Sequence, residues 1–99
     1  MSISESRVPT ANGSKYLQQL CKHWSHKLEV EFTPEKGTVR FPTSCATMTV
    51  EPDVLLVRVE AEDAATLERM QGVVADHLDR FAFREAPLAF DWRPVAVSS

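Results

Sequence analysis

The chain has 99 residues, of which 43% are hydrophobic and 25% are charged, and its formal net charge at pH 7 is −3. Such a length and composition are typical of one globular domain around one core. We therefore predict a single domain over residues 1–99, with its core in about residues 3–93 and a tail at 94–99. The excess of acidic residues argues against general binding to nucleic acid or to an anionic membrane, because such binding depends on neutralising phosphate charges.

The two cysteines, Cys21 and Cys45, fall on different predicted elements and are too few for a disulfide framework. We expect both to be reduced, as is usual for thiols in the cytoplasm. The longest apolar run, Val54–Val57, is far too short to span a bilayer, and the N-terminus does not have the pattern of a signal peptide. These features predict a cytoplasmic protein that does not contact the membrane.

Residues 2–10 alternate weakly and predict a strand, which Pro9 would place at a sheet edge because proline cannot donate to a ladder. Residues 16–27 predict an amphipathic helix that ends near Ser25 and is capped by Thr10 or Asn12. Its polar face has Lys15, Gln19 and Lys22, and its margin has Tyr16 and His23. The core-facing stripe, at helical spacing, comprises Leu17, Leu20, Cys21 and Trp24.

Four segments then alternate with period two, which is typical of half-buried strands: residues 28–32, 38–41, 45–50 and 55–60. Short turns at 33–37, 42–44 and 51–53 join them, and Gly37 is expected to adopt a left-handed conformation. The pattern predicts an antiparallel four-strand meander. The residues expected on its open, more polar face are Arg40, Thr47, Thr49, Leu56, Arg58 and Glu60.

Asp63 is expected to cap a second helix that ends between Arg80 and Phe83, followed by a short strand at residues 88–92. The inward side of this helix comprises Leu67, Met70, Val74, His77, Leu78 and Phe81. The order β-α-β-β-β-β-α-β predicts an α+β fold with two layers, in which both helices cover one face of the meander.

The three histidines are the first candidates for a site. His23 and His26 are three residues apart and so are neighbours on a helix, and His77 lies on the second helix. Together with Cys21, the pair His23 and His77 has side chains that suit a transition metal. No carboxylate falls at ligand spacing near His23, so packed or partly exposed histidines are the simpler interpretation.

Nucleophilic catalysis by Cys21 with His77 as its base is the second interpretation. It needs an ionised thiol, whereas burial in the apolar stripe raises the pKa of a thiol and makes it inert. We assign no catalytic residue. The sequence has no glycine-rich phosphate loop, and we expect no cofactor.

Arg80 and Arg84 lie four residues apart, a spacing at which they can hold an anion or pair with Asp76 and Glu85. Several aromatic residues near the ends of the two helices are expected to pack in the core. We predict a pocket at the end of the molecule where both helices finish. The aromatic residues are Trp24, Phe81, Phe83 and Trp92.

Four segments together resemble a known family: Tyr16–Lys27, Val59–Asp63, His77–Glu85 and Asp91–Arg93. They are similar to the bacterial domains of unknown function catalogued as number 2218, over Arg7–Arg93. The resemblance implies a two-layer fold of the TATA-binding-protein-like class. It also implies an association with siderophore-interacting flavin reductases, to which similar domains are sometimes fused. Likeness of fold does not carry DNA binding with it, because function depends on individual sites.

We therefore expect a non-enzymatic accessory or binding domain linked to iron or siderophore handling. Its partner would be a siderophore-interacting flavin reductase or a small ligand. The alternative is a small metal-binding protein or an enzyme that uses His23 and His77. A homodimer joined through the open sheet face or an edge strand is a third expectation. The candidate ligand-binding residues are His23, His26, His77, Arg80 and Arg84.

Overall fold

The computed structural model of the chain describes residues 2–95, so residues 96–99 of the predicted tail lie outside the described part. Six strands and two helices form the domain. In chain order they are β1 (Ser2–Pro9), α1 (Gly13–Trp24), β2 (Glu29–Phe32), β3 (Lys36–Arg40), β4 (Ser44–Glu51), β5 (Val54–Ala61), α2 (Ala64–Phe81) and β6 (Arg93–Pro94).

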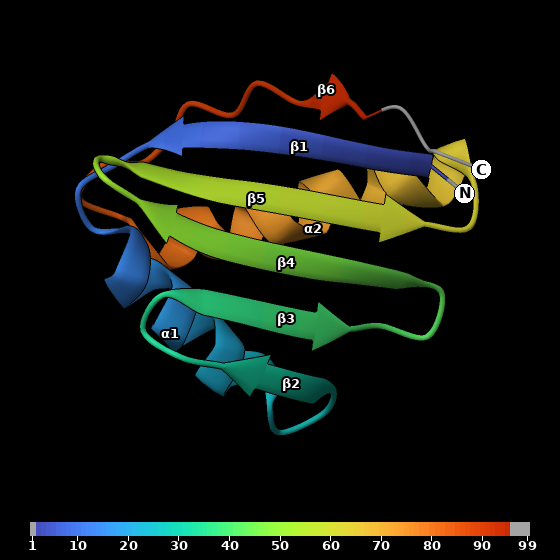
Figure 1. The fold of residues 1–99 in the computed structure, drawn as a ribbon, viewed down its shortest axis with the longest axis horizontal. Coiled ribbons are helices and arrows are strands. Elements are labelled where there is room, and N and C mark those ends of the chain that lie inside the picture. The colour runs from blue at the N-terminus through green and yellow to red at the C-terminus, as the bar shows by residue number, and fades with distance from the viewer. Residues whose placement is uncertain (1, 96–99) are drawn as a thin grey trace.

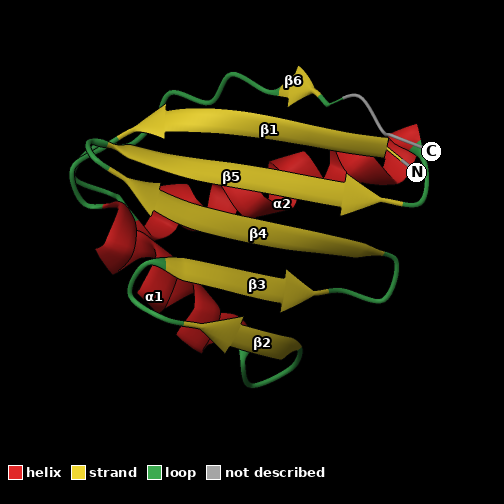
Figure 2. Ribbon diagram, viewed as in Figure 1, coloured by secondary structure: helices red, strands yellow, loops and turns green. Residues whose placement is uncertain are grey.

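The strands form one antiparallel sheet in the order β2-β3-β4-β5-β1-β6. Figures 1 and 2 show both helices behind this sheet, so that its other face is left open. The predicted α+β fold, the β2–β5 meander and the placement of both helices on one face are confirmed. No helix among residues 2–95 is long and apolar enough to cross a bilayer.

The position of β1 differs from the prediction. Instead of forming an edge, β1 lies between β5 and β6. It pairs with β5 along its whole length, from Ser2 opposite Ala61 to Pro9 opposite Val54, whereas β6 pairs only with Ser4 and Glu5. The outer side of β1 therefore has no neighbouring strand at its Pro9 end. The missing N–H of Pro9 costs no hydrogen bond there, because no strand would accept it.

The last strand also differs. It was expected at residues 88–92, but β6 comprises only Arg93–Pro94, at the boundary between the expected core and the expected tail. In the stretch before β6, the N–H of Leu88 donates to the Asp79 carboxylate (2.9 Å) and the N–H of Asp91 donates to the Ser6 hydroxyl (2.9 Å). Side chains thus satisfy backbone donors that a ladder would otherwise use. The alternating apolar residues still pack inward.

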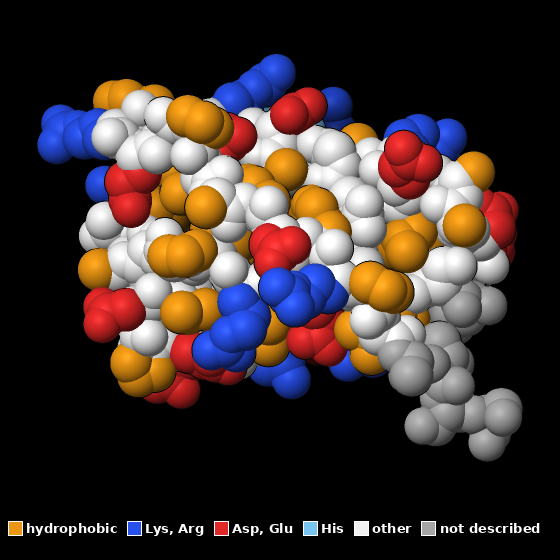
Figure 3. All heavy atoms as spheres, turned by 90° about the horizontal axis from the view of Figure 1, so that it is seen from above, with side chains coloured by type: hydrophobic (Ala, Val, Ile, Leu, Met, Phe, Trp, Pro, Cys, Tyr) orange, Lys and Arg blue, Asp and Glu red, His pale blue; other side chains and the backbone are white. Residues whose placement is uncertain are grey.

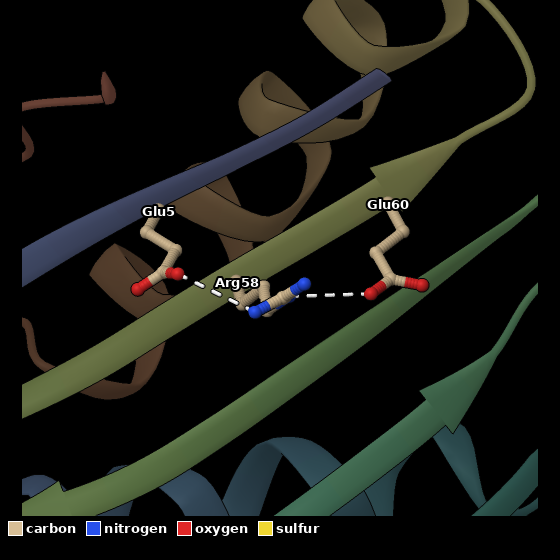
Figure 4. Close-up of polar contacts among 3 residues, drawn as sticks. All are labelled: Glu5, Arg58 and Glu60. Atoms are coloured by element: carbon tan, nitrogen blue, oxygen red, sulfur yellow. Dashed lines mark hydrogen bonds and ion pairs between the residues drawn. The ribbon is translucent and has the colours of Figure 1, made fainter. Parts of the chain in front are cut away.

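The open face of the sheet carries the polar residues that were predicted for it. The register places Thr47 opposite Arg58 and Thr49 opposite Leu56. Arg58 lies between two carboxylates, at 3.5 Å from Glu5 and 3.2 Å from Glu60, as Figure 4 shows. These partly exposed ion pairs contribute little to stability.

The helix starts follow the prediction only in part. Asp63 caps α2, because its carboxylate accepts a hydrogen bond from the Thr66 N–H (2.7 Å). α1 begins at Gly13, and the Asn12 side chain makes no capping bond. The Thr10 hydroxyl instead accepts from the N–H of Asn12 (3.1 Å). Asn12 therefore occupies the N-cap position, as expected, but neither it nor Thr10 supplies a side-chain bond to a first-turn amide, because both side chains bind elsewhere.

Gly37 is needed for a different reason from the one predicted. No glycine among residues 2–95 has a positive φ, and the left-handed residue is Asp53 (φ 58°) in the β4–β5 turn. Gly37 lies inside β3, where an added Cβ would be 2.7 Å from the Sγ atom of Cys21. Its missing side chain makes room for α1.

The position of Gln19 also differs from the prediction. Its side chain was expected in water, but it is half-buried and its Oε1 atom has no hydrogen-bond partner among the described residues.

Candidate functional site

Two histidines from different helices meet at the surface. His23 is exposed on the last turn of α1, and His77 is half-buried on α2. Their ring centroids are 5.6 Å apart. The end of α1 and the last part of α2 therefore come together at the residues that the sequence singled out.

Aromatic rings surround this pair. The Trp24 ring lies 4.9 Å from the His77 ring and 5.1 Å from Phe41, and the Phe81 ring lies 5.9 Å from His23. Trp24 is buried, whereas Phe41 and Phe81 are partly buried. We call these five residues, His23, Trp24, Phe41, His77 and Phe81, the histidine cluster.

One hydrogen bond indicates which ring nitrogen of neutral His77 carries the proton. Its Nδ1 atom lies 2.7 Å from the carbonyl oxygen of Val73, one helical turn earlier. A carbonyl oxygen can only accept, so Nδ1 carries the proton and the neutral ring has its lone pair on Nε2. This arrangement orients the imidazole and leaves Nε2 able to bind a metal or to accept a proton.

Cys21 lies apart from the two histidines. Its side chain is fully buried and points toward Gly37 in β3. Burial raises the pKa of the Cys21 thiol to about 11, so the thiol is protonated at neutral pH and unsuited to attack a substrate. Within residues 2–95, no three His, Cys, Asp or Glu side chains form a group able to hold a metal ion.

The remaining candidates do not join the cluster. His26 is exposed in the turn after α1, and Arg80 is exposed on α2. The guanidinium of Arg84 lies over the Phe83 ring, 5.8 Å from its centroid. Among the described residues, neither arginine forms the ion pairs expected with Asp76 and Glu85.

The predicted core position of Phe83 is wrong. This side chain is 72% exposed, because α2 ends at Phe81 and the inward position after it is taken by the buried Ala82. The last turn of α1 does meet the last part of α2, since His23 lies beside both His77 and Phe81, the last residue of α2. The first turn of α1 meets the segment after α2, where Tyr16 bonds to Glu85.

A separate hollow lies on the opposite side of the sheet. It has a volume of about 620 Å³ between β1 and the chain around β6. Figure 3, which looks onto this edge, shows arginine or lysine side chains next to acidic ones. Its lining comprises Glu5, Arg7, Asp91, Arg93, Pro94 and Val95. Arg7 and Arg93 are paired with Glu51 (2.7 Å) and Asp91 (2.8 Å).

Glu85, which the sequence suggested only as a partner for Arg80 or Arg84, organises the other end of α1. Glu85 accepts hydrogen bonds from the hydroxyls of Thr10 (3.0 Å) and Tyr16, and from the side-chain amide of Asn12 (3.1 Å). The bond from Tyr16, followed by that from Asn12, lowers the pKa of Glu85. The same bond, with burial, raises the pKa of Tyr16. No sequence signal links residues so far apart in the chain.

We expect the contribution of Glu85 to stability to depend on pH. Its pKa is lowered from the ordinary 4.5, so the contribution is complete above that pH and is lost as the pH falls through the lowered pKa. The pKa of Tyr16 is raised, so its contribution to stability has the opposite pH dependence: it is complete below pH 10.0 and is lost as the pH rises through the raised pKa. Glu85→Gln should therefore lower the urea midpoint at pH 7, and the difference from the unmodified chain should shrink by pH 3.

The control is Glu68→Gln, which removes an exposed carboxylate of α2 that makes no hydrogen bond or ion pair among the described residues. It should leave the midpoint unchanged at both pH values. A difference for Glu85→Gln that is equally large at pH 7 and pH 3 would contradict this role of Glu85.

Comparison with known proteins agrees with the resemblance seen in the sequence. The family model described as "Uncharacterized protein conserved in bacteria (DUF2218)" matches residues 5–93. A comparison with curated proteins finds no match. A solved structure, the NMR structure of PA4090 from Pseudomonas aeruginosa, is 42% identical in sequence, with a TM-score of 0.80, over 94% of this chain and 96% of that chain. The chain belongs to the bacterial family DUF2218.

Proposed function

We propose that the chain is a small, non-enzymatic binding domain in bacterial iron or siderophore handling, located in the cytoplasm, and that it binds its ligand at the histidine cluster. The iron part of the proposal rests on the association that the family resemblance implies. The location of the site rests on one observation: the rings of His23 and His77, from separate helices, lie 5.6 Å apart at the surface.

The number of ligands favours an ion that arrives already chelated. A structural zinc site uses four protein ligands and a catalytic one usually three, whereas this cluster offers two imidazoles. Two imidazoles are suited to fill the open positions of an iron ion whose other positions a chelator holds. The partly buried ring of Phe81 beside them offers a surface on which an aryl group of a chelator can pack.

A protein partner fits the same proposal. A siderophore-interacting flavin reductase delivers electrons to chelated iron, and a domain that holds the chelate beside it would act as its accessory. Reduction produces Fe²⁺, for which imidazole is a better ligand than for Fe³⁺. The exposed position of His23, at the end of α1, leaves the cluster accessible to a ligand held by another protein.

The second candidate is a metal-binding protein or enzyme that uses His23 and His77 directly. The hydrogen bond from His77 Nδ1 to Val73 favours it, since metal-binding histidines commonly donate their second nitrogen to a carbonyl. In an enzyme, the free Nε2 atom would act as a general base.

The two candidates are separated by titrating the untagged protein with a gallium chelate that has open positions, as a diamagnetic substitute for the ferric complex, and separately with Zn²⁺. Imidazole NMR signals report which histidines bind. We expect the chelate to shift the signals of His23 and His77, and His23→Ala or His77→Ala to weaken binding at least about tenfold. The matched control His26→Ala removes a nearby exposed imidazole and should bind normally.

Stoichiometric binding of Zn²⁺ alone, lost in both variants, would replace the first candidate by the second. Absence of any shift at His23 and His77 with either probe would overturn both.

A further inference from the structure

The outer edge of the sheet at β2 is open. β2 is the first strand in the sheet order, and Figure 1 shows it at the lower margin with no strand beyond it. The N–H of Thr33 donates to the carbonyl of Lys36 (2.8 Å), so Thr33 and Lys36 form a hydrogen-bonded pair at the turn end of the β2–β3 ladder. Bonded and non-bonded pairs alternate in antiparallel strands, so Val30 and Phe32 direct their backbone N–H and C=O groups to the free edge.

The side chains of β2 make this edge acidic. Glu29 and Glu31 are exposed and share the open face of the sheet with Arg40, which pairs opposite Glu29. The Arg40 guanidinium is 3.9 Å from Glu29, at the limit of an ion pair, and Glu31 has no ion pair among residues 2–95. Natural edges are commonly protected by short length, charged side chains, proline or a bulge, and β2 has the first two of these, with four residues and two glutamates.

A second copy of the chain does not fit this edge. If two β2 strands paired about a two-fold axis perpendicular to the sheet, residues of the same face would lie opposite each other. In the two registers that pair most of β2, that places Glu29 opposite Glu31, or Glu31 opposite its own copy. Carboxylates directly opposite each other in adjacent strands repel, so the edge disfavours self-pairing while its backbone groups stay available.

We propose that the β2 edge binds an extended, basic segment of another protein as an added strand. The backbone of the segment would bond to Val30 and Phe32, and its alternate lysine or arginine side chains would face Glu29 and Glu31. Phe32, which is 36% exposed, supplies an apolar contact at one end. Beside it is a shallow hollow of about 300 Å³, lined by Glu31, Phe32, Thr33, Lys36 and Thr38.

This surface is separate from the histidine cluster. His23 and His77 lie on the helices behind the sheet, whereas Glu29 and Glu31 point to the opposite, open face. The two proposals can therefore fail independently.

The test uses the whole chain, labelled with nitrogen-15, and a short blocked peptide that alternates lysine with threonine. We expect the peptide to shift the amide signals of Val30 and Phe32 most. The same peptide with N-methyl groups on the amides that face β2 should not bind, because it keeps the charge and loses the backbone donors. Binding of the N-methylated peptide with equal affinity would overturn strand addition in favour of simple charge attraction.

The variant Glu29→Lys with Glu31→Lys should weaken binding about tenfold at low salt, because two opposed charges are reversed. The matched control, Glu68→Lys with Asp76→Lys on the exposed side of α2, changes the net charge equally and should bind within about twofold of the unmodified chain. Equal losses in both variants would overturn the assignment to β2. A dimer in light scattering, with β2 amides protected in the absence of peptide, would also overturn it.

Discussion

Gly37→Ala is expected to lower the free energy of unfolding by about 2–3 kcal/mol, which is large for a single added methyl group. The new Cβ would lie 2.7 Å from the Sγ of Cys21 and 3.3 Å from the Cδ2 of Leu17, inside the packed interface between β3 and α1. Because Gly37 has no positive φ, the cost arises from lack of space alone. Urea denaturation monitored by circular dichroism measures it.

Two further variants isolate the cause. Cys21→Ala removes the sulfur atom, so Gly37→Ala should cost about 1 kcal/mol less in that background than alone. Gly72→Ala is the matched control, because an added Cβ there meets nothing within 4 Å on the exposed side of α2. It should stabilise the chain by about 0.5–1 kcal/mol through helix propensity. Additive effects of Gly37→Ala and Cys21→Ala would contradict the proposed clash.

Trp24→Ala should cost about 3–5 kcal/mol, since it removes the largest buried side chain of α1 and leaves a cavity between Phe41 and His77. A small domain has about 5–15 kcal/mol in total, so this loss is a large fraction of it. Trp92→Ala is the comparison, because Trp92 is only partly buried and stacks on Phe90 at 5.7 Å. It should cost about 1–2 kcal/mol.

If Trp24→Ala does not fold, Trp24→Phe provides the same test. Phenylalanine keeps an aromatic ring and should retain most of the stability, with a measurable decrease in the urea midpoint. Equal costs for the alanine variants of Trp24 and Trp92 would contradict the burial on which the argument rests.

The central part of the fold was predictable because its patterns are local. Alternation along β2–β5 and the turn at Pro52 determine the meander, and helical spacing identifies the buried stripes of α1 and α2. The convergence of His23 and His77 was also predictable, because both residues border those stripes and the two helices share one face of the sheet.

The errors arise where distant side chains decide the structure. Residues 88–92 have strand alternation, but hydrogen bonds to Ser6 and Asp79 hold their backbone. Thr10 and Asn12 resemble helix caps, but both bind Glu85, more than seventy residues later in the chain. A local sequence pattern does not show whether a polar side chain will bond to a nearby backbone amide or to a residue far away in the chain.

The position of β1 between β5 and β6 has a consequence for the order of assembly during synthesis. β1 is made first, yet its hydrogen-bond partners are Val54–Ala61 and Arg93–Pro94, which the ribosome adds much later. The meander β2–β5 contains only neighbouring pairs and can form without β1, so β5 is then a bare outer strand. Until β1 pairs with it, the nascent domain exposes the edge of β5. At this stage the chain is most prone to incorrect pairing with another chain.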